Sequence, residues 1–180
     1  EEAVRLASSI SRPLIIDVGT GSGCIAVAVA REVPGATIMA VDISPAALDV
    51  AARNAARHGL SDRINFKLSN LLDGLGPGTT ADLILSNPPY IDPSEIPSLQ
   101  REVRDWEPRI ALTDENDGLS NYRRLLQGAG AFLKSEGKLI VEVGYEQAGK
   151  VAALATEFGW SETRVLQDLA GIDRTLVISK

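Results

Sequence analysis

Short apolar runs alternate with longer segments of helical pattern along most of the chain. Runs typical of buried strands lie at residues 14–18, 37–41, 64–68, 81–86 and 138–144, and a closing pair lies at 161–166 and 174–179. Segments with a helical pattern lie at residues 24–33, 45–58, 118–134 and 146–158. Strands that alternate with helices assemble into parallel sheets covered by helices. The pattern therefore predicts an α/β domain with a mostly parallel sheet, closed by a C-terminal hairpin.

Residues 91–117 break this alternation. They are irregular, charged and contain proline, so we expect a loop with one short helix. An insertion of this length in a compact domain is usually a lid or a binding segment.

Composition narrows the classes of protein that fit. The chain has 180 residues, 44% of them hydrophobic and 23% charged, which fits a single domain over residues 1–180. No apolar run approaches the ~20 residues that a membrane-spanning helix needs. One cysteine, Cys24, excludes an internal disulfide and fits a reducing cytoplasm. The net charge of −6 disfavours a nucleic acid as the main substrate.

A glycine-rich turn follows the first predicted strand. The segment Asp17-Val-Gly19-Thr-Gly21-Ser-Gly23 joins that strand to a helix, which is the layout of a nucleotide-binding turn. Asp42 ends the next strand, where an acidic residue commonly binds both ribose hydroxyls of an adenosine cofactor. The alternatives are a generic tight turn and a surface aspartate near a helix start. Together the two motifs favour an adenosine-containing ligand without saying which one.

The fourth predicted strand ends in Ser86-Asn-Pro-Pro-Tyr-Ile91. Proline cannot continue a sheet ladder, so the strand should stop here in a stiff turn with few donors. Such a turn suits the binding of an N–H₂ group, although an ordinary strand-ending loop would also contain prolines. Because the first and fourth strands of such a sheet are expected to be neighbours, the turn should lie beside the cofactor.

Together, the glycine turn, Asp42 and Asn87-Pro-Pro-Tyr90 resemble the motifs of class I S-adenosylmethionine-dependent methyltransferases that act on amino or amide nitrogen. The stretches 86–91, 102–112 and 141–147 resemble the release-factor glutamine N5-methyltransferases. This resemblance spans nearly the whole chain and implies a doubly wound, Rossmann-like sheet of seven strands with helices on both faces. The small helical N-terminal domain of that family is expected to be missing, because the chain opens abruptly inside a helical segment.

The resemblance also implies the site. Cofactor-binding residues would be those of the glycine turn and of the neighbouring strand ends: Asp17, Gly19, Thr20, Gly21, Ser22, Gly23, Asp42, Ile43, Asn70, Leu71 and Asn87. Catalytic residues would be those of the turn after the fourth strand: Asn87, Pro88, Pro89 and Tyr90. No metal is expected. Asn70 departs from the family, whose members usually have an acidic residue there, but its carbonyl can still accept from the adenine amino group.

The implied reaction is methylation of a glutamine side-chain amide in a peptide chain release factor. The Asn87 side-chain oxygen and the Pro88 backbone oxygen would hold both N–H bonds of that amide, and Tyr90 would pack on its planar face. We expect a cytoplasmic monomer that neither enters a membrane nor binds nucleic acid stably.

Two other functions would account for parts of the same sequence pattern. A methyltransferase of exocyclic amines on DNA or RNA bases would use the same turn, with the base stacked on the aromatic ring. A non-catalytic adenosine-binding module would have no use for that turn. Among the remaining residues, Cys24 is expected to be a small buried hydrophobe and His58 a surface residue. The segment 101–109 is expected to be either a solvated loop or a wall of the peptide site.

Overall fold

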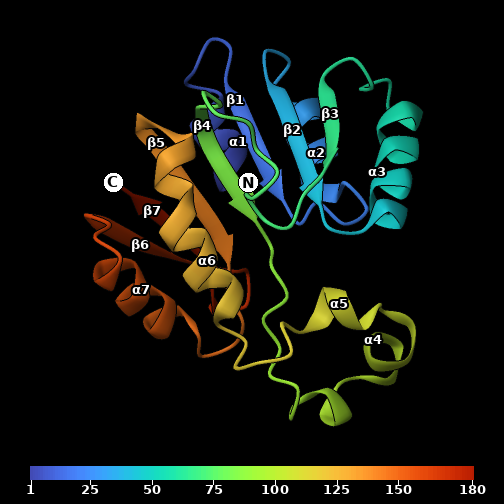
Figure 1. Ribbon diagram of the computed structural model, residues 1–180, viewed down its shortest axis with the longest axis vertical. Helices are drawn as coiled ribbons and strands as arrows, with labels where there is room; N and C mark the ends of the chain where they lie inside the picture. The colour runs from blue at the N-terminus through green and yellow to red at the C-terminus, as the bar shows by residue number, and fades with distance from the viewer.

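A twisted sheet of seven strands organises the chain, and the computed structural model describes all residues from 1 to 180 (Figure 1). The strand order is β3-β2-β1-β4-β5-β7-β6. Parallel pairs join β3 through β5, whereas β7 runs antiparallel to both β5 and β6. The strands are β1 (Leu14–Val18), β2 (Thr37–Asp42), β3 (Ile64–Leu68), β4 (Ala81–Ser86), β5 (Leu133–Glu142), β6 (Glu162–Gln167) and β7 (Asp173–Ser179). The predicted doubly wound sheet with its C-terminal antiparallel pair is confirmed.

Helices cover both faces of the sheet, because successive strand side chains point to opposite sides. Ile16 and Ile84 belong to one core cluster, which packs against two helices. Ile15 and Leu83 belong to the opposite cluster, which packs against three. The first pair of helices is α6 (Ser120–Ala129) and α7 (Ala148–Glu157), and the second group is α1 (Glu2–Ala7), α2 (Cys24–Glu32) and α3 (Pro45–Arg57). None of the helices has the length and apolar character required to cross a bilayer.

The boundary between α6 and β5 differs from the prediction. The helix expected over residues 118–134 ends at Ala129, a short 3₁₀ turn η2 (Gly130–Phe132) follows, and β5 begins at Leu133. Lys134 therefore lies in the strand, where its ammonium group is 2.8 Å from both carboxylate oxygens of Asp82 on β4. This ion pair holds the first part of β5 against β4. Its two partners are far apart in the sequence, so local periodicity could not reveal it.

The insertion between β4 and α6 contains more regular structure than expected. It forms η1 (Ile96–Ser98), α4 (Arg101–Trp106) and α5 (Arg109–Leu112), so the prediction of one short helix was wrong. Figure 1 shows this segment beyond the end of β4, away from the body of the sheet. The Ile91 amide donates to the Leu112 carbonyl at 2.9 Å. That bond joins the start of the insertion to a residue near its end. Residues 91–117 therefore form a closed segment rather than an open loop, and we call this segment the arm.

Gly23 sets how closely α2 approaches α3. Its φ angle is +80°, and a Cβ atom there would lie 2.9 Å from the Ala51 Cβ on α3. Gly59, after α3, has a similar φ angle of +67°, but an added Cβ would meet nothing within 4 Å. The two glycines therefore share the same backbone requirement and differ in their surroundings.

We predict that Gly23→Ala destabilises the fold more than Gly59→Ala does. The left-handed conformation alone costs about 1–3 kcal/mol in a residue other than glycine. Overpacking against Ala51 should add about 1–3 kcal/mol at Gly23 only. Urea unfolding of both variants measures the difference. Equal losses in the two variants would show that contact with α3 does not constrain Gly23.

Candidate functional site

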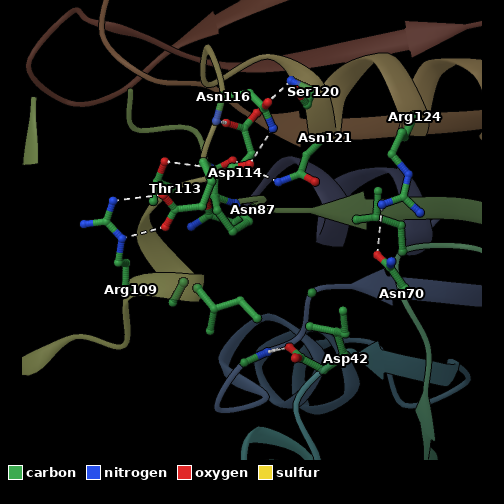
Figure 2. Close-up of a pocket in the computed structure, with 18 of the residues that line it drawn as sticks. Asp42, Asn70, Asn87, Arg109, Thr113, Asp114, Asn116, Ser120, Asn121 and Arg124 are labelled. Atoms are coloured by element: carbon green, nitrogen blue, oxygen red, sulfur yellow. Dashed lines mark hydrogen bonds and ion pairs between the residues drawn. The ribbon is translucent and has the colours of Figure 1, made fainter. Parts of the chain in front are cut away.

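A cavity of about 620 Å³ opens at the carboxyl ends of β1, β2 and β4 (Figure 2). Its wall combines the glycine turn, the end of β2, the turn after β4, the arm and the start of α6. Many of the predicted site residues line it: Gly19, Gly21, Asp42, Ile43, Asn70, Leu71, Asn87 and Pro89. Asp17, Thr20, Ser22, Gly23, Pro88 and Tyr90 do not.

The glycine turn is fastened to the end of β2. The amides of Gly19 and Thr20 both donate to the Val41 carbonyl, at 2.8 and 3.0 Å. Thr20 is buried, and its hydroxyl donates to Asp17 Oδ2 at 2.6 Å. Thr20 thus supports the turn from inside the protein, while Gly19 and Gly21 face the cavity.

Asp17 lies beneath the turn and is fully buried. Its Oδ2 also accepts from the Ala26 amide at 3.2 Å, at the start of α2. Its Oδ1 is the only buried side-chain nitrogen or oxygen that lacks a hydrogen-bond partner. Burial raises the pKa of Asp17 to about 6, although the hydrogen bonds from Thr20 and Ala26 oppose that shift. Asp17 therefore links β1, the turn and α2 from below the cavity.

Asp42 connects the two predicted cofactor motifs. The Gly21 amide donates to Asp42 Oδ2 at 2.8 Å, and the Ser44 amide donates to Oδ1 at 2.9 Å. These bonds fix the carboxylate at the cavity wall, and a carboxylate oxygen can accept a second hydrogen bond. Both oxygens thus keep acceptor capacity for a ligand, as the prediction of ribose binding requires.

The turn after β4 lies directly beside the glycine turn. Val18 at the end of β1 pairs with Ser86 at the end of β4, and the Ser86 hydroxyl donates to the Val18 carbonyl at 2.8 Å. The predicted proximity of these strands is thereby confirmed. Asn87 is exposed at the cavity, and Pro88 behind it is buried. Neither the Asn87 side chain nor the Pro88 carbonyl has a hydrogen-bond partner within the chain.

Tyr90 does not line the cavity and packs against the core cluster on the α6–α7 face. Its hydroxyl donates to Glu142 Oε1, at the end of β5, at 3.2 Å. Burial and the nearby Glu142 carboxylate raise the pKa of Tyr90. Contact between its ring and a substrate amide stays a prediction.

Two side-chain amides hold the end of the turn that follows β4. Asn121 Nδ2 on α6 donates to the Pro89 carbonyl at 3.1 Å, and Gln147 Nε2 before α7 donates to the Tyr90 carbonyl at 2.9 Å. Neither residue was among the predicted site residues. The place of Gln147 just after the strand next to β4 was the available signal, whereas no pattern marks Asn121.

Asn70 is already paired at its carbonyl oxygen. Arg124 on α6 donates to Asn70 Oδ1 at 3.0 Å and to Asp73 Oδ2 at 2.8 Å, and Figure 2 shows the first of these bonds. An adenine amino group would therefore have to share that oxygen with Arg124. Arg124 also lines the cavity and was not among the predicted residues.

The arm contributes the far wall of the cavity (Figure 2). Arg109 donates to both carboxylate oxygens of Glu115, at 2.6 and 2.9 Å, and this pairing lowers the pKa of Glu115. Asp114 accepts from the amides of Asn116, Gly118 and Ser120 at 2.7–3.1 Å. Of the two expectations for residues 101–109, Arg109 fits the wall, while Trp106 is largely exposed to solvent.

Ser22 and Gly23 line a separate shallow pocket with Cys24, Asn54 and His58. Asn54 donates to the Ser22 carbonyl at 2.9 Å, which ties α3 to the turn. Cys24 is exposed, so the expectation that it is a buried hydrophobe was wrong. It occupies the first position of α2, where the side chain faces outward. The exposed position expected for His58 is confirmed. No grouping of three or more His, Cys, Asp or Glu side chains could hold a metal ion.

Comparisons with known proteins agree with this geometry. Residues 5–102 match the family model of the methyltransferase small domain. A release factor glutamine methyltransferase of Cereibacter sphaeroides is 46% identical over 160 residues, covering 89% of this chain and 57% of that protein. One of Rhodopirellula baltica is 44% identical over 169 residues, covering 93% of this chain and 57% of that protein. A crystal structure of the ribosomal protein L11 methylase from Lactobacillus delbrueckii subsp. bulgaricus has a TM-score of 0.68 at 23% identity, covering 99% of this chain and 77% of that one.

The resemblance seen in the sequence motifs is therefore confirmed, although the chain spans just over half the length of these two curated relatives. The likeness to the solved structure supports the fold. Since the family model matches more than half of the residues, this chain belongs to the methyltransferase small domain family.

Proposed function

We propose that this chain transfers a methyl group from S-adenosylmethionine to the side-chain amide nitrogen (N5) of a glutamine in a peptide chain release factor. The observation that carries the proposal is the position of Asn87, which opens into the same cavity as the glycine turn and Asp42. The relatives named for this reaction support it. The reaction in the cytoplasm, a monomeric state and the lack of stable nucleic-acid binding stay predictions.

The part of the cavity lined by the glycine turn and the end of β2 fits the cofactor. S-adenosylmethionine, when bound, supplies an electrophilic methyl group on a sulfonium sulfur. Asp42 would accept from the two ribose hydroxyls with the acceptor capacity that its bonds to Gly21 and Ser44 leave. Gly19 and Gly21, where an added Cβ would meet no protein atom within 4 Å, let a ligand approach the backbone closely. Ile43, 48% exposed at the cavity, offers apolar surface to the adenine.

The turn after β4 would hold the substrate. A glutamine amide nitrogen is a poor nucleophile, because its lone pair is delocalised into the carbonyl. Asn87 Oδ1 and the Pro88 carbonyl would accept one N–H bond each and so direct the lone pair toward the methyl group. Both acceptors are free of partners within the chain. Alignment of reactants contributes roughly 7–11 kcal/mol in favourable cases, which is the kind of catalysis this turn can provide.

The same turn would discriminate between substrates. Two oxygen acceptors repel the carboxylate of a glutamate, which has no N–H bond to offer. A nucleic-acid substrate would bring phosphate groups near the cavity. Both arginines of the wall are already paired there, Arg109 with Glu115 and Arg124 with Asp73. This pairing favours a protein substrate over the exocyclic amine of a base.

The function is tested by incubating the chain with methyl-labelled S-adenosylmethionine and either a release factor or nucleic acid. We expect label on the release factor, mapped to a glutamine by peptide mass spectrometry. Label on nucleic acid alone would support the rival base methyltransferase. Binding of the cofactor without transfer to either acceptor would support an adenosine-binding module.

We predict that Asp42→Ala weakens binding of S-adenosylhomocysteine by about 1–3 kcal/mol, since a charged acceptor for the ribose is lost. Asp49→Ala is the matched control, because Asp49 is exposed on α3 and outside the cavity. Calorimetric titration gives both affinities, and NAD should bind neither variant nor the parent. Equal affinity in Asp42→Ala and Asp49→Ala would remove Asp42 from the cofactor site.

For Asn87→Ala we predict a fall in kcat/KM toward release factor of about 100-fold or more, the usual effect of losing one oriented transition-state hydrogen bond. Cofactor affinity should change little. Asn87→Asp keeps an acceptor of nearly the same shape and should retain more activity than Asn87→Ala. Parental turnover in both variants would leave Asn87 as a structural strand terminator only.

A further inference from the structure

The three carbonyls that follow Asn87 in the turn are not equivalent. The Pro89 carbonyl accepts from Asn121 at 3.1 Å, and the Tyr90 carbonyl accepts from Gln147 at 2.9 Å. Only the Pro88 carbonyl has no donor within the chain. The protein therefore occupies two of three adjacent acceptors with its own amide groups. The Pro88 carbonyl, next to Asn87 in the chain, is thus the one acceptor of the three that the protein leaves unpaired.

Gln147 is fixed at both ends of its amide. While its Nε2 donates to the Tyr90 carbonyl, its Oε1 accepts from the Gly144 amide at 3.1 Å. An added Cβ at Gly144 would lie 2.7 Å from Gln147 Oε1 and 3.0 Å from the Tyr90 ring. An added Cβ at Gly118 would lie 3.1 Å from Gln147 Nε2 and would clash with the Tyr90 carbonyl oxygen. Two glycines thus leave just enough room for this side chain between the turn and its neighbours.

The bonds from Asn121 and Gln147 join the turn after β4 to α6 and to the start of α7. Asn121 belongs to α6, and Gln147 immediately precedes α7. Prolines at two consecutive positions deprive the turn of backbone donors, so it cannot brace itself through its own amides. After the turn, the first backbone amide that donates a hydrogen bond is that of Ile91, and its acceptor is the Leu112 carbonyl of the arm. The direction of Asn87 and Pro88 therefore depends on donors supplied from elsewhere in the chain.

We propose that Gln147 and Asn121 are positioning residues for methyl transfer, which hold the Tyr90 and Pro89 carbonyls and so leave the Asn87 side chain and the Pro88 carbonyl as the acceptors for the substrate nitrogen. The inference rests on the proposed function, because it concerns the same turn. Neither residue needs to touch the reacting atoms. A shift of the turn by about 1 Å is enough to cost about 100-fold in rate, because alignment is what the turn provides.

The sharpest variant is Gln147→Glu. It keeps the shape of the side chain and the acceptor for Gly144, but it places a second oxygen against the Tyr90 carbonyl. We expect kcat to fall about 10- to 100-fold, with KM for the release factor and affinity for S-adenosylhomocysteine within about twofold of the parent. Gln127→Glu is the matched control, because Gln127 is exposed on α6 outside the cavity and makes the same change of charge.

A double-mutant cycle distinguishes positioning from a general loss of structure. In an Asn87→Ala background, Gln147→Glu should lower kcat by a smaller factor than in the parent, because one of the two acceptors that it aligns is already gone. The same loss in both backgrounds would overturn the inference, as would parental kcat in Gln147→Glu. If Gln147→Glu fails to fold, Asn121→Ala removes the other donor without adding charge. It should lower kcat about 3- to 10-fold at constant KM, and a parental kcat there would overturn the inference.

Hydrogen exchange supplies a readout that needs no substrate. The Ile91 amide should exchange faster in Gln147→Glu than in Gln127→Glu, because a displaced turn weakens its bond to Leu112. If the parent chain labels no glutamine, the proposed function fails, and exchange alone then decides whether Gln147 holds the turn in place. Equal exchange in the two variants would then overturn it. If the parent labels glutamine but Gln147→Glu matches Gln127→Glu in kcat, only the positioning inference fails.

Discussion

The parallel pairing of β1 with β4 is the constraint on which the site depends. Val18 and Ser86 are partners at the carboxyl ends of these strands, and the Ser86 hydroxyl closes the contact on the Val18 carbonyl. The glycine turn leaves one strand at this point and the Asn87 turn leaves the other. Two loops separated by most of the first half of the chain therefore open into one cavity. A strand order that separated β1 from β4 would place the two motifs apart along the same edge of the sheet.

The polar groups around the cavity follow a simple division. Most of them bind other groups of the protein. Asp17 accepts from Thr20 in the glycine turn, and Arg109 pairs with Glu115. Asn121 and Gln147 each donate to a backbone carbonyl of the turn after β4. Asp42 and Asn87 keep acceptors that face the cavity. Because buried polar groups are costly when unpaired, a wall that satisfies its own groups elsewhere marks these acceptors as the ones available to a ligand. Asn87 is available to a ligand because the neighbouring Pro89 and Tyr90 carbonyls already accept hydrogen bonds from the protein.

Local signals predicted the strands, the glycine turn and the stop at Asn87, because apolar periodicity, glycine and proline act through neighbouring residues. The parts that were missed depend on partners distant in the sequence. Lys134 in β5 pairs with Asp82 on β4, and Gln147 donates to the Tyr90 carbonyl. The arm forms short helices where its composition indicated a loop, and the bond that closes it, between Ile91 and Leu112, joins residues distant in the sequence. Cys24 was expected inside on residue type alone, although its place at the first turn of α2 faces it outward.

The central claim is that the Asn87 turn receives the nitrogen that is methylated. A crystal structure of the chain with S-adenosylhomocysteine and a glutamine-containing release-factor peptide tests it most directly. We expect the glutamine amide nitrogen within about 2.7–3.2 Å of both Asn87 Oδ1 and the Pro88 carbonyl oxygen. A glutamine amide bound elsewhere in the cavity, with both of those oxygens facing solvent, would contradict the account.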